Sequence, residues 1–275
     1  MQSSNPVFTR SDGFNGRNQT GYATFDQPAG YGTPVTWDGT SSGRMTIDTV
    51  VQKTAFTLGV VALVAAITWV TTGQLNLGGG YVDKDVQSRL YVLSMVGAFG
   101  GFALSLVNSF KRVISPALVI AYAAFEGLFV GAFSKVVGTW VGDGAVVGAV
   151  LGTVAAVAGT LAAYKVFDIQ VNNKFRTWVI GAMFGFVAVS LFDFVLSLFH
   201  ADLGFNGFGP MGLVSSFIGL GIGVLMLILD FDFVERGIAA GLPERESWRA
   251  AFGLTVTIIW IYIELLRIIA ILRGD

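Results

Sequence analysis

Seven long apolar runs are the feature of this sequence that most restricts its fold. Each has about 20 residues, enough for an α-helix rising about 1.5 Å per residue to cross roughly 30 Å of hydrocarbon. Pro116 and Pro210 fit helix starts, where the missing proline N–H costs nothing. The sequence predicts an all-α integral membrane protein, one seven-transmembrane-helix domain over residues 45–275. Its expected spans are 54–72, 90–110, 116–134, 144–164, 178–199, 211–230 and 250–272.

The composition agrees with a membrane protein and excludes several functional classes. Of 275 residues, 53% are hydrophobic and 13% charged, and the mean hydropathy is +0.68, so the lipid bilayer is the first expected partner. A net charge of -1 without a basic patch argues against nucleic acid. The chain has no cysteine and a single histidine, His200, which argues against thiol chemistry and a zinc cluster. We expect no resident cofactor.

The first 44 residues are polar and rich in Gly, Ser, Thr and Asn, and lack the apolar core of a secretory signal peptide. They predict a disordered polar tail. Two interpretations stay open for this tail, a solvated segment without a task and a segment that docks on a partner. The second would use its aromatic residues, Phe8, Phe14, Tyr22, Phe25, Tyr31 and Trp37.

The distribution of lysine and arginine predicts the orientation. Twelve lie in the tail and the even-numbered loops and four on the opposite side, while Arg267 lies within the last span. Because basic residues concentrate on the cytoplasmic side, we expect the N-terminus in the cytoplasm and, after seven spans, the C-terminus across the cytoplasmic membrane.

Ionisable residues deep inside the spans are costly and mark candidate functional positions. Glu126, Asp193 and Glu264 fall on three helices at about 21 to 25 Å from the basic ends, with Arg267 beside them. They form a candidate outer acidic level. Three local alternatives stay open: Glu264 and Arg267 pair at i,i+3, Ser190 or Ser197 partners Asp193, and Arg267 partners Glu126.

Asp230 and Asp232 lie nearer the basic end and point about 200° apart on a helix, so they cannot share a partner. Asp232 is spaced i,i+4 from Arg236, which favours a local salt bridge. Asp230 is deeper, at about 9 Å from that face, and Thr257 stands close to its level. We interpret Asp230 as the functional acid.

The remaining patterns predict helix packing and no known enzyme motif. Gly144, Gly148 and Gly152 form a small-residue stripe that favours close helix packing, as do Gly97, Gly101, Gly219 and Gly223. The sequence contains no phosphate-binding loop, nucleophile elbow or HExxH motif. We therefore do not expect an enzyme.

Four stretches, "SSNPVF", "MTIDTVVQKTAFTLG", "LILDFDFVERG" and "YIELLRIIAIL", appear in an order and spacing that resembles the Bax inhibitor-1 family, also called the transmembrane Bax inhibitor motif family. The first two look like its bacterial, actinobacterial YccA-like branch. The resemblance covers the chain from about Met45 to its end.

This resemblance implies six helices around a central seventh, and a pH-sensitive calcium leak governed by an aspartate pair on the last two helices. Asp230 matches the first acid, and Thr257 stands where the second is expected. Asp230 is then the candidate calcium ligand, with calcium or protons as partners, although one carboxylate would bind calcium more weakly than two. The alternative is a non-transporting regulator of a membrane-bound protease or another membrane complex.

Overall fold

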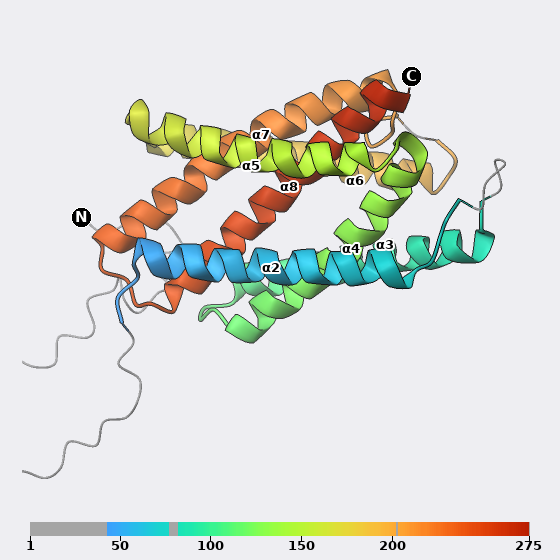
Figure 1. Cartoon of the computed structure of the whole chain (residues 1–275). Coiled ribbons are helices and arrows are strands. Elements are labelled where there is room, and N and C mark those ends of the chain that lie inside the picture. Colours follow the sequence, from blue (N-terminus) through green and yellow to red (C-terminus); the bar gives the residue numbers. More distant parts are fainter. Residues whose placement is uncertain (1–42, 77–81, 202, 275) are drawn as a thin grey trace, which may run out of the picture.

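The computed structural model describes residues 43–76, 82–201 and 203–274, and the regular secondary structure of this part is helical apart from two isolated bridges (Figure 1). Seven helices are long and apolar enough to cross a membrane, which confirms the seven predicted spans. They are α2 (Ile47–Thr71), α3 (Lys84–Phe110), α4 (Pro116–Val141), α5 (Gly144–Val166), α6 (Asn173–Ser197), α7 (Pro210–Ala239) and α8 (Glu246–Gly274).

Polar side chains cap the N-termini of three helices, α2, α3 and α6. Thr46 and Thr49 form a reciprocal capping box at the start of α2. The Asp83 carboxylate accepts the N–H groups of Asp85 and Val86 at the start of α3, at 2.9 and 3.1 Å. Pro116 and Pro210 open α4 and α7 as predicted. Since α7 continues to Ala239, the aspartates that follow its apolar run are still helical.

Helix α8 lies at the centre of the bundle, which confirms the predicted position of the last helix. In its most apolar stretch 67% of residues are buried, against 11% in α6. It packs against α2, α4, α5 and α7, while α3 packs on α4 and α6 on α7 (Figure 1). The polar residues of α8 are therefore shielded from lipid by the surrounding helices.

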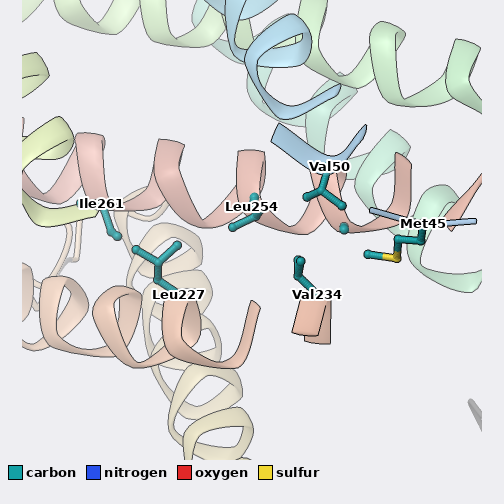
Figure 2. Close-up of a cluster of buried hydrophobic side chains, with 7 residues drawn as sticks. Met45, Val50, Leu227, Val234, Leu254 and Ile261 are labelled. Carbon is teal, nitrogen blue, oxygen red and sulfur yellow. The ribbon is translucent and has the colours of Figure 1, made fainter. Parts of the chain in front are cut away.

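A buried apolar cluster joins α8 to α7 and the start of α2 (Figure 2). Met45 and Val50, at the entry and first turn of α2, meet Leu227 of α7 and Leu254 and Ile261 of α8. Leu227 and Ile261 are fully buried. Close contact among these side chains supplies the dispersion energy that holds helices together where lipid removes much of the hydrophobic drive.

Gly43 and Arg44, which the sequence analysis grouped with the polar tail, pair with the α7–α8 connection. The Gly43 carbonyl accepts the N–H of Glu244 at 2.6 Å, and Arg44 forms a bridge with Pro243. The next residue, Met45, donates its N–H to the Leu242 carbonyl at 2.7 Å. These pairs tie the entry of α2 to the α7–α8 connection. The rest of the predicted tail, residues 1–42, lies outside the described residues.

The predicted third span ends at Ser134, which places Lys135 in a loop; this end is wrong, because α4 continues to Val141. The Lys135 side chain is buried and caps the end of α2. The ammonium group donates to the Trp69 carbonyl at 2.5 Å, to the Thr72 hydroxyl at 2.8 Å and to the Gly73 carbonyl. A cation at this position satisfies carbonyl groups that a helix C-terminus leaves free.

Glycines provide the close approaches between helices. The predicted stripe of Gly144, Gly148 and Gly152 faces α8, where Arg273, Ile269 and Leu265 would contact an added Cβ at 3.1 to 3.4 Å; this confirms close packing. The tighter approach is between α4 and α2. At Gly131 an added Cβ would lie 2.6 Å from the Ala65 carbonyl oxygen, so only glycine fits without moving the backbone.

We therefore predict that Gly131→Ala destabilises the bundle by about 1 to 3 kcal/mol, the usual cost of overpacking. Gly159→Ala is the matched control, because an added Cβ there meets nothing within 4 Å. That control gains about 1 kcal/mol of helix propensity at most. Thermal unfolding in detergent measures both, and a Gly131→Ala protein as stable as Gly159→Ala would contradict the packing.

Candidate functional site

The charged residues of the bundle fall into groups at different levels, and Asp232 forms the first. This buried carboxylate accepts from Arg236 Nε at 2.8 Å, which confirms the predicted i,i+4 pair. It also accepts from Arg176 of α6 at 2.9 Å, a partner that the sequence did not indicate. Arg236 in turn donates to the Val171 carbonyl. Asp232 thus joins α7 to the start of α6, and its charge is compensated twice.

Asp230 forms the second group with Thr257 of α8. Its half-buried carboxylate accepts the Thr257 hydroxyl at 2.6 Å, so the two residues stand level, as the depth count predicted. Gly253, one turn earlier on α8, leaves room for this carboxylate: an added Cβ would lie 3.3 Å from Oδ1. Within the described ranges no ion pair includes Asp230. In these ranges the side-chain partner of the Asp230 carboxylate is the neutral Thr257 hydroxyl.

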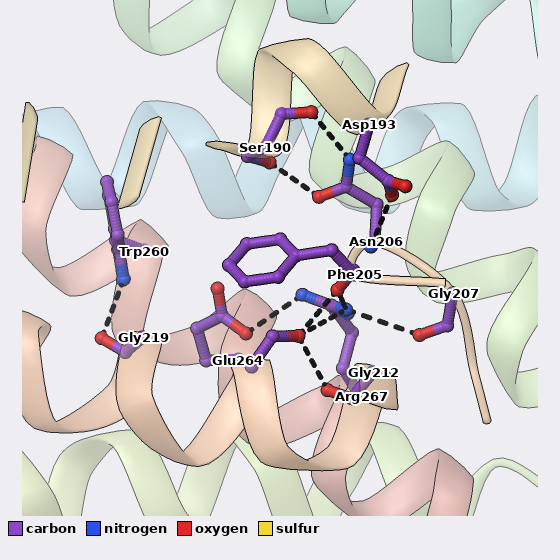
Figure 3. A network of polar contacts seen from close by, with 11 residues as sticks. Ser190, Asp193, Phe205, Asn206, Gly207, Gly212, Gly219, Trp260, Glu264 and Arg267 are labelled. Carbon is purple, nitrogen blue, oxygen red and sulfur yellow. Dashed lines mark hydrogen bonds and ion pairs between the residues drawn. The ribbon is translucent and has the colours of Figure 1, made fainter. Parts of the chain in front are cut away.

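Glu264 and Arg267 form the third group, further along α8. Both side chains are buried, and Arg267 Nη1 donates to Glu264 at 3.1 Å, so the predicted i,i+3 pair is confirmed. Arg267 Nη2 also donates to the carbonyls of Phe205 at 2.9 Å and Gly207 at 3.2 Å (Figure 3). The guanidinium therefore joins the central helix to the α6–α7 connection.

Asp193 has backbone partners in place of the predicted serines. Its carboxylate accepts the N–H groups of Leu203 at 2.6 Å and Asn206 at 2.8 Å. Ser190 donates instead to the Asn206 side chain, and Ser197 to the Phe194 carbonyl, so the expected serine partnership is wrong. The physical reason is that the chain after α6 folds back over Asp193. The N–H groups of Leu203 and Asn206 therefore occupy the carboxylate oxygens, in place of the serine hydroxyls.

Glu126 lies apart from Arg267, and that predicted pairing is wrong. The Tyr122 hydroxyl, one turn earlier on α4, is its hydrogen-bond partner. The carboxylate sits against Gly101 of α3, where an added Cβ would lie 2.7 Å from Oε1. Arg267 is engaged elsewhere, with Glu264 and the α6–α7 connection.

The three acids of the expected outer level therefore occupy three different interfaces. Glu126 lies between α4 and α3, Asp193 faces the α6–α7 connection, and Glu264 lies between α8 and α7. Across residues 43–76, 82–201 and 203–274, no group of three or more His, Asp or Glu side chains could hold a metal ion. A calcium ion at Asp230 would complete its oxygen shell with hydroxyl, carbonyl and water ligands.

Glycines opposite the acids are a feature that the sequence analysis missed. Gly101 faces Glu126, Gly253 faces Asp230, and Gly219 faces Glu264, whose Oε1 would lie 2.7 Å from an added Cβ. Gly101 and Gly219 were predicted only as helix-packing residues. The absence of a side chain on the neighbouring helix provides the space that each carboxylate fills. No spacing along one helix could reveal this pairing, because it depends on how two helices align.

The fold and these buried carboxylates define a polytopic seven-helix membrane protein. The model of the Bax inhibitor 1 like family matches residues 5–274, and the chain belongs to that family. An "Uncharacterized protein" of Chlamydia muridarum (strain MoPn / Nigg) is similar to it, with 27% identity over 215 residues, 74% of this chain and 85% of that protein.

We predict that Asp232→Asn destabilises the protein by about 1 to 3 kcal/mol, because two arginines lose a buried counter-charge but stay partly exposed to solvent. Asp48→Asn, an exposed residue in the first turn of α2, is the control and should change stability by less than about 0.5 kcal/mol. Denaturant or thermal unfolding in mild detergent distinguishes them. Equal stability of the two variants would remove Asp232 as a structural link.

Proposed function

We propose that this protein is a leak or channel for cations, with calcium as the first candidate, and that Asp230 is its gate residue. One observation carries the proposal. Asp230 is a carboxylate within a membrane-spanning helix, half-buried, and answered by the Thr257 hydroxyl in place of a cation. Unpaired acids inside the membrane are rare and typically mark ion or proton pathways.

The other acids support this choice by contrast. Asp232 has two arginines, Glu264 has Arg267, and Asp193 has two backbone N–H groups. Each is held by a positive charge or by hydrogen bonds that stabilise its charged form. In the described part of the chain Asp230 has one hydroxyl hydrogen bond and no positive partner, so a permeant cation would supply the missing charge. Glu126, with only a tyrosine hydroxyl, is the second candidate on the pathway.

The weak ligand set favours passage over retention. Calcium takes six to eight oxygen ligands in sites that hold it tightly. Asp230 and Thr257 supply only a carboxylate and a hydroxyl, and conduction requires binding weak enough for the ion to leave. We propose that protons and calcium compete for the Asp230 carboxylate, which makes the leak sensitive to pH. The proposal involves no catalysis.

We place the protein in the cytoplasmic membrane, with its N-terminus in the cytoplasm and its C-terminus on the opposite side. The twelve basic residues of the tail and even-numbered loops support this orientation. Asp230 and Thr257 then lie toward the cytoplasmic end of the bundle, and Glu264 and Arg267 lie about 10 to 15 Å further out along α8.

A second candidate function is regulation of a membrane-bound protease or another membrane complex, as in a YccA-like protein. One observation favours it. The pairing of Gly43 with Glu244, beside the Lys53–Glu244 salt bridge of 2.9 Å, fixes the position of Gly43, the residue to which residues 1–42 are joined. A partner that binds those residues would be held next to the α7–α8 connection.

For the leak, we predict that Asp230→Asn reduces calcium flux into proteoliposomes at least about tenfold between pH 6 and 8. Thr257→Asp restores two carboxylates at one level and should strengthen calcium binding and its pH dependence. Asp85→Asn, an exposed acid at the start of α3, is the control and keeps wild-type flux. An Asp230→Asn protein with unchanged flux, or a wild type without flux, would reject the leak.

For the regulator, we predict that deleting residues 1–42 removes the partners co-purified in mild detergent and leaves calcium flux intact. The deletion stops before Gly43 so that its pairing with Glu244 is kept. Unchanged partners after the deletion would argue against a tail-mediated interaction.

A further inference from the structure

The connection between α6 and α7 folds back against the bundle, and residues 203–209 of it hold an unusual number of polar contacts (Figure 3). Residues 204–208 are all half-buried. A connection of this kind ordinarily lies on the surface, because its backbone groups need water. Here buried side chains of three helices supply their hydrogen bonds.

The first clamp is Asp193 of α6. Only 3% of this residue is exposed, and its two carboxylate oxygens accept the N–H groups of Leu203 and Asn206. The Asn206 side chain is held as well, since it accepts from the Ser190 hydroxyl at 2.5 Å and donates to the Ser190 carbonyl at 2.7 Å. Bonds to an ionised acceptor are about twice as strong as neutral ones.

The second clamp comes from α7 and α8. Arg267, 7% exposed, donates to the carbonyls of Phe205 and Gly207, and the Ser215 hydroxyl donates to the same Phe205 carbonyl. Arg267 lies ten residues after Thr257, about 15 Å further along α8. The clamped segment therefore covers the end of the bundle remote from Asp230.

Aromatic side chains complete the closure from two sides. Phe205 contacts Phe186 of α6 with ring centroids 5.1 Å apart. Phe208 contacts Trp140 of α4 at 5.2 Å and Phe133 at 6.4 Å. The segment thus contacts α6, α4 and the outer part of α8.

The clamp also carries an internal cost. Arg267 Nε is buried without a hydrogen-bond partner in the described part of the chain. A buried polar group without a partner raises the free energy of the state that contains it. Water that enters when the segment lifts would satisfy this group, which would lower the free-energy difference between the closed and open states.

We propose that residues 203–209 are a plug, clamped by Asp193 and Arg267, that closes the bundle at the end remote from Asp230 and lifts when an ion passes. The gating part rests on the proposed cation leak. The clamping of residues 203–209 by Asp193 and Arg267 does not depend on the leak. Separate measurements test the clamping and the gating.

Amide hydrogen exchange in lipid nanodiscs tests the clamp. We expect the amides of Leu203 and Asn206 to be protected in the wild type. In Asp193→Asn their exchange should be about 10- to 100-fold faster, the range for losing hydrogen bonds to a charged group, while α8 keeps its protection. Asp232→Asn, another buried aspartate at the other end, is the matched control and leaves residues 203–209 protected. Unchanged exchange of residues 203–209 in Asp193→Asn would overturn the clamp.

Cross-linking tests the gating without altering Asp193. The chain has no cysteine, so Ser190→Cys with Asn206→Cys creates a single disulfide that fixes the plug to α6. We expect calcium flux to fall at least about tenfold on oxidation and to return on reduction. The control pair, Thr49→Cys with Ser247→Cys, replaces two hydroxyls 2.8 Å apart at the other end of the bundle and should keep its flux.

Undiminished flux in the oxidised Ser190/Asn206 double variant, or equal loss in both pairs, would overturn the plug as a gate. If neither reduced pair nor the wild type conducts calcium, the leak itself is rejected, and with it the gating. The hydrogen-exchange result still decides whether Asp193 clamps residues 203–209 in that case.

Discussion

This structure depends on one constraint: the protein itself must supply the polar or oppositely charged groups that compensate a charge inside the hydrocarbon. Helix α8 carries Glu264 and Arg267 deep in its sequence and is the most enclosed helix. Backbone carbonyls and a hydroxyl of neighbouring elements hydrogen-bond to Arg267, and Gly219 of α7 leaves space for Glu264. The same requirement explains why Lys135 is drawn to the C-terminus of α2 and Asp232 to two arginines. Asp230 and Glu126 differ from these residues, because the partner of each is a neutral hydroxyl, from Thr257 and Tyr122 respectively.

Interactions within one helix were predictable from the sequence, and those between elements were not. Hydropathy gave the seven spans, and spacing gave the pairs Asp232–Arg236 and Glu264–Arg267, because i,i+3 and i,i+4 neighbours share a helix face. The equal depth of Thr257 and Asp230 was also predictable, because the rise per residue of a helix converts sequence position into depth. The partners of Asp193 did not follow: they depend on how the chain turns after α6, and that turn leaves no periodic signal.

The polar groups divide the bundle into two functional levels. Toward the basic end, Asp230 offers a carboxylate that a passing cation could use. Further along α8, Arg267 presents a positive charge that is committed to Glu264 and to the carbonyls of residues 205 and 207. In the proposed leak, this arrangement is the closed resting state, with a weak cation site at Asp230 beneath the clamped residues 203–209. Glu126, between α4 and α3, lies outside both groups and has the Tyr122 hydroxyl beside it.

The central claim is that the Asp230 carboxylate meets a cation directly. Infrared difference spectroscopy of the protein in bilayers, with and without calcium, tests it without any need for transport. The account predicts a calcium-induced change in the carboxylate stretching bands that disappears in Asp230→Asn and persists in Asp232→Asn. An identical difference spectrum in wild type and Asp230→Asn would contradict it.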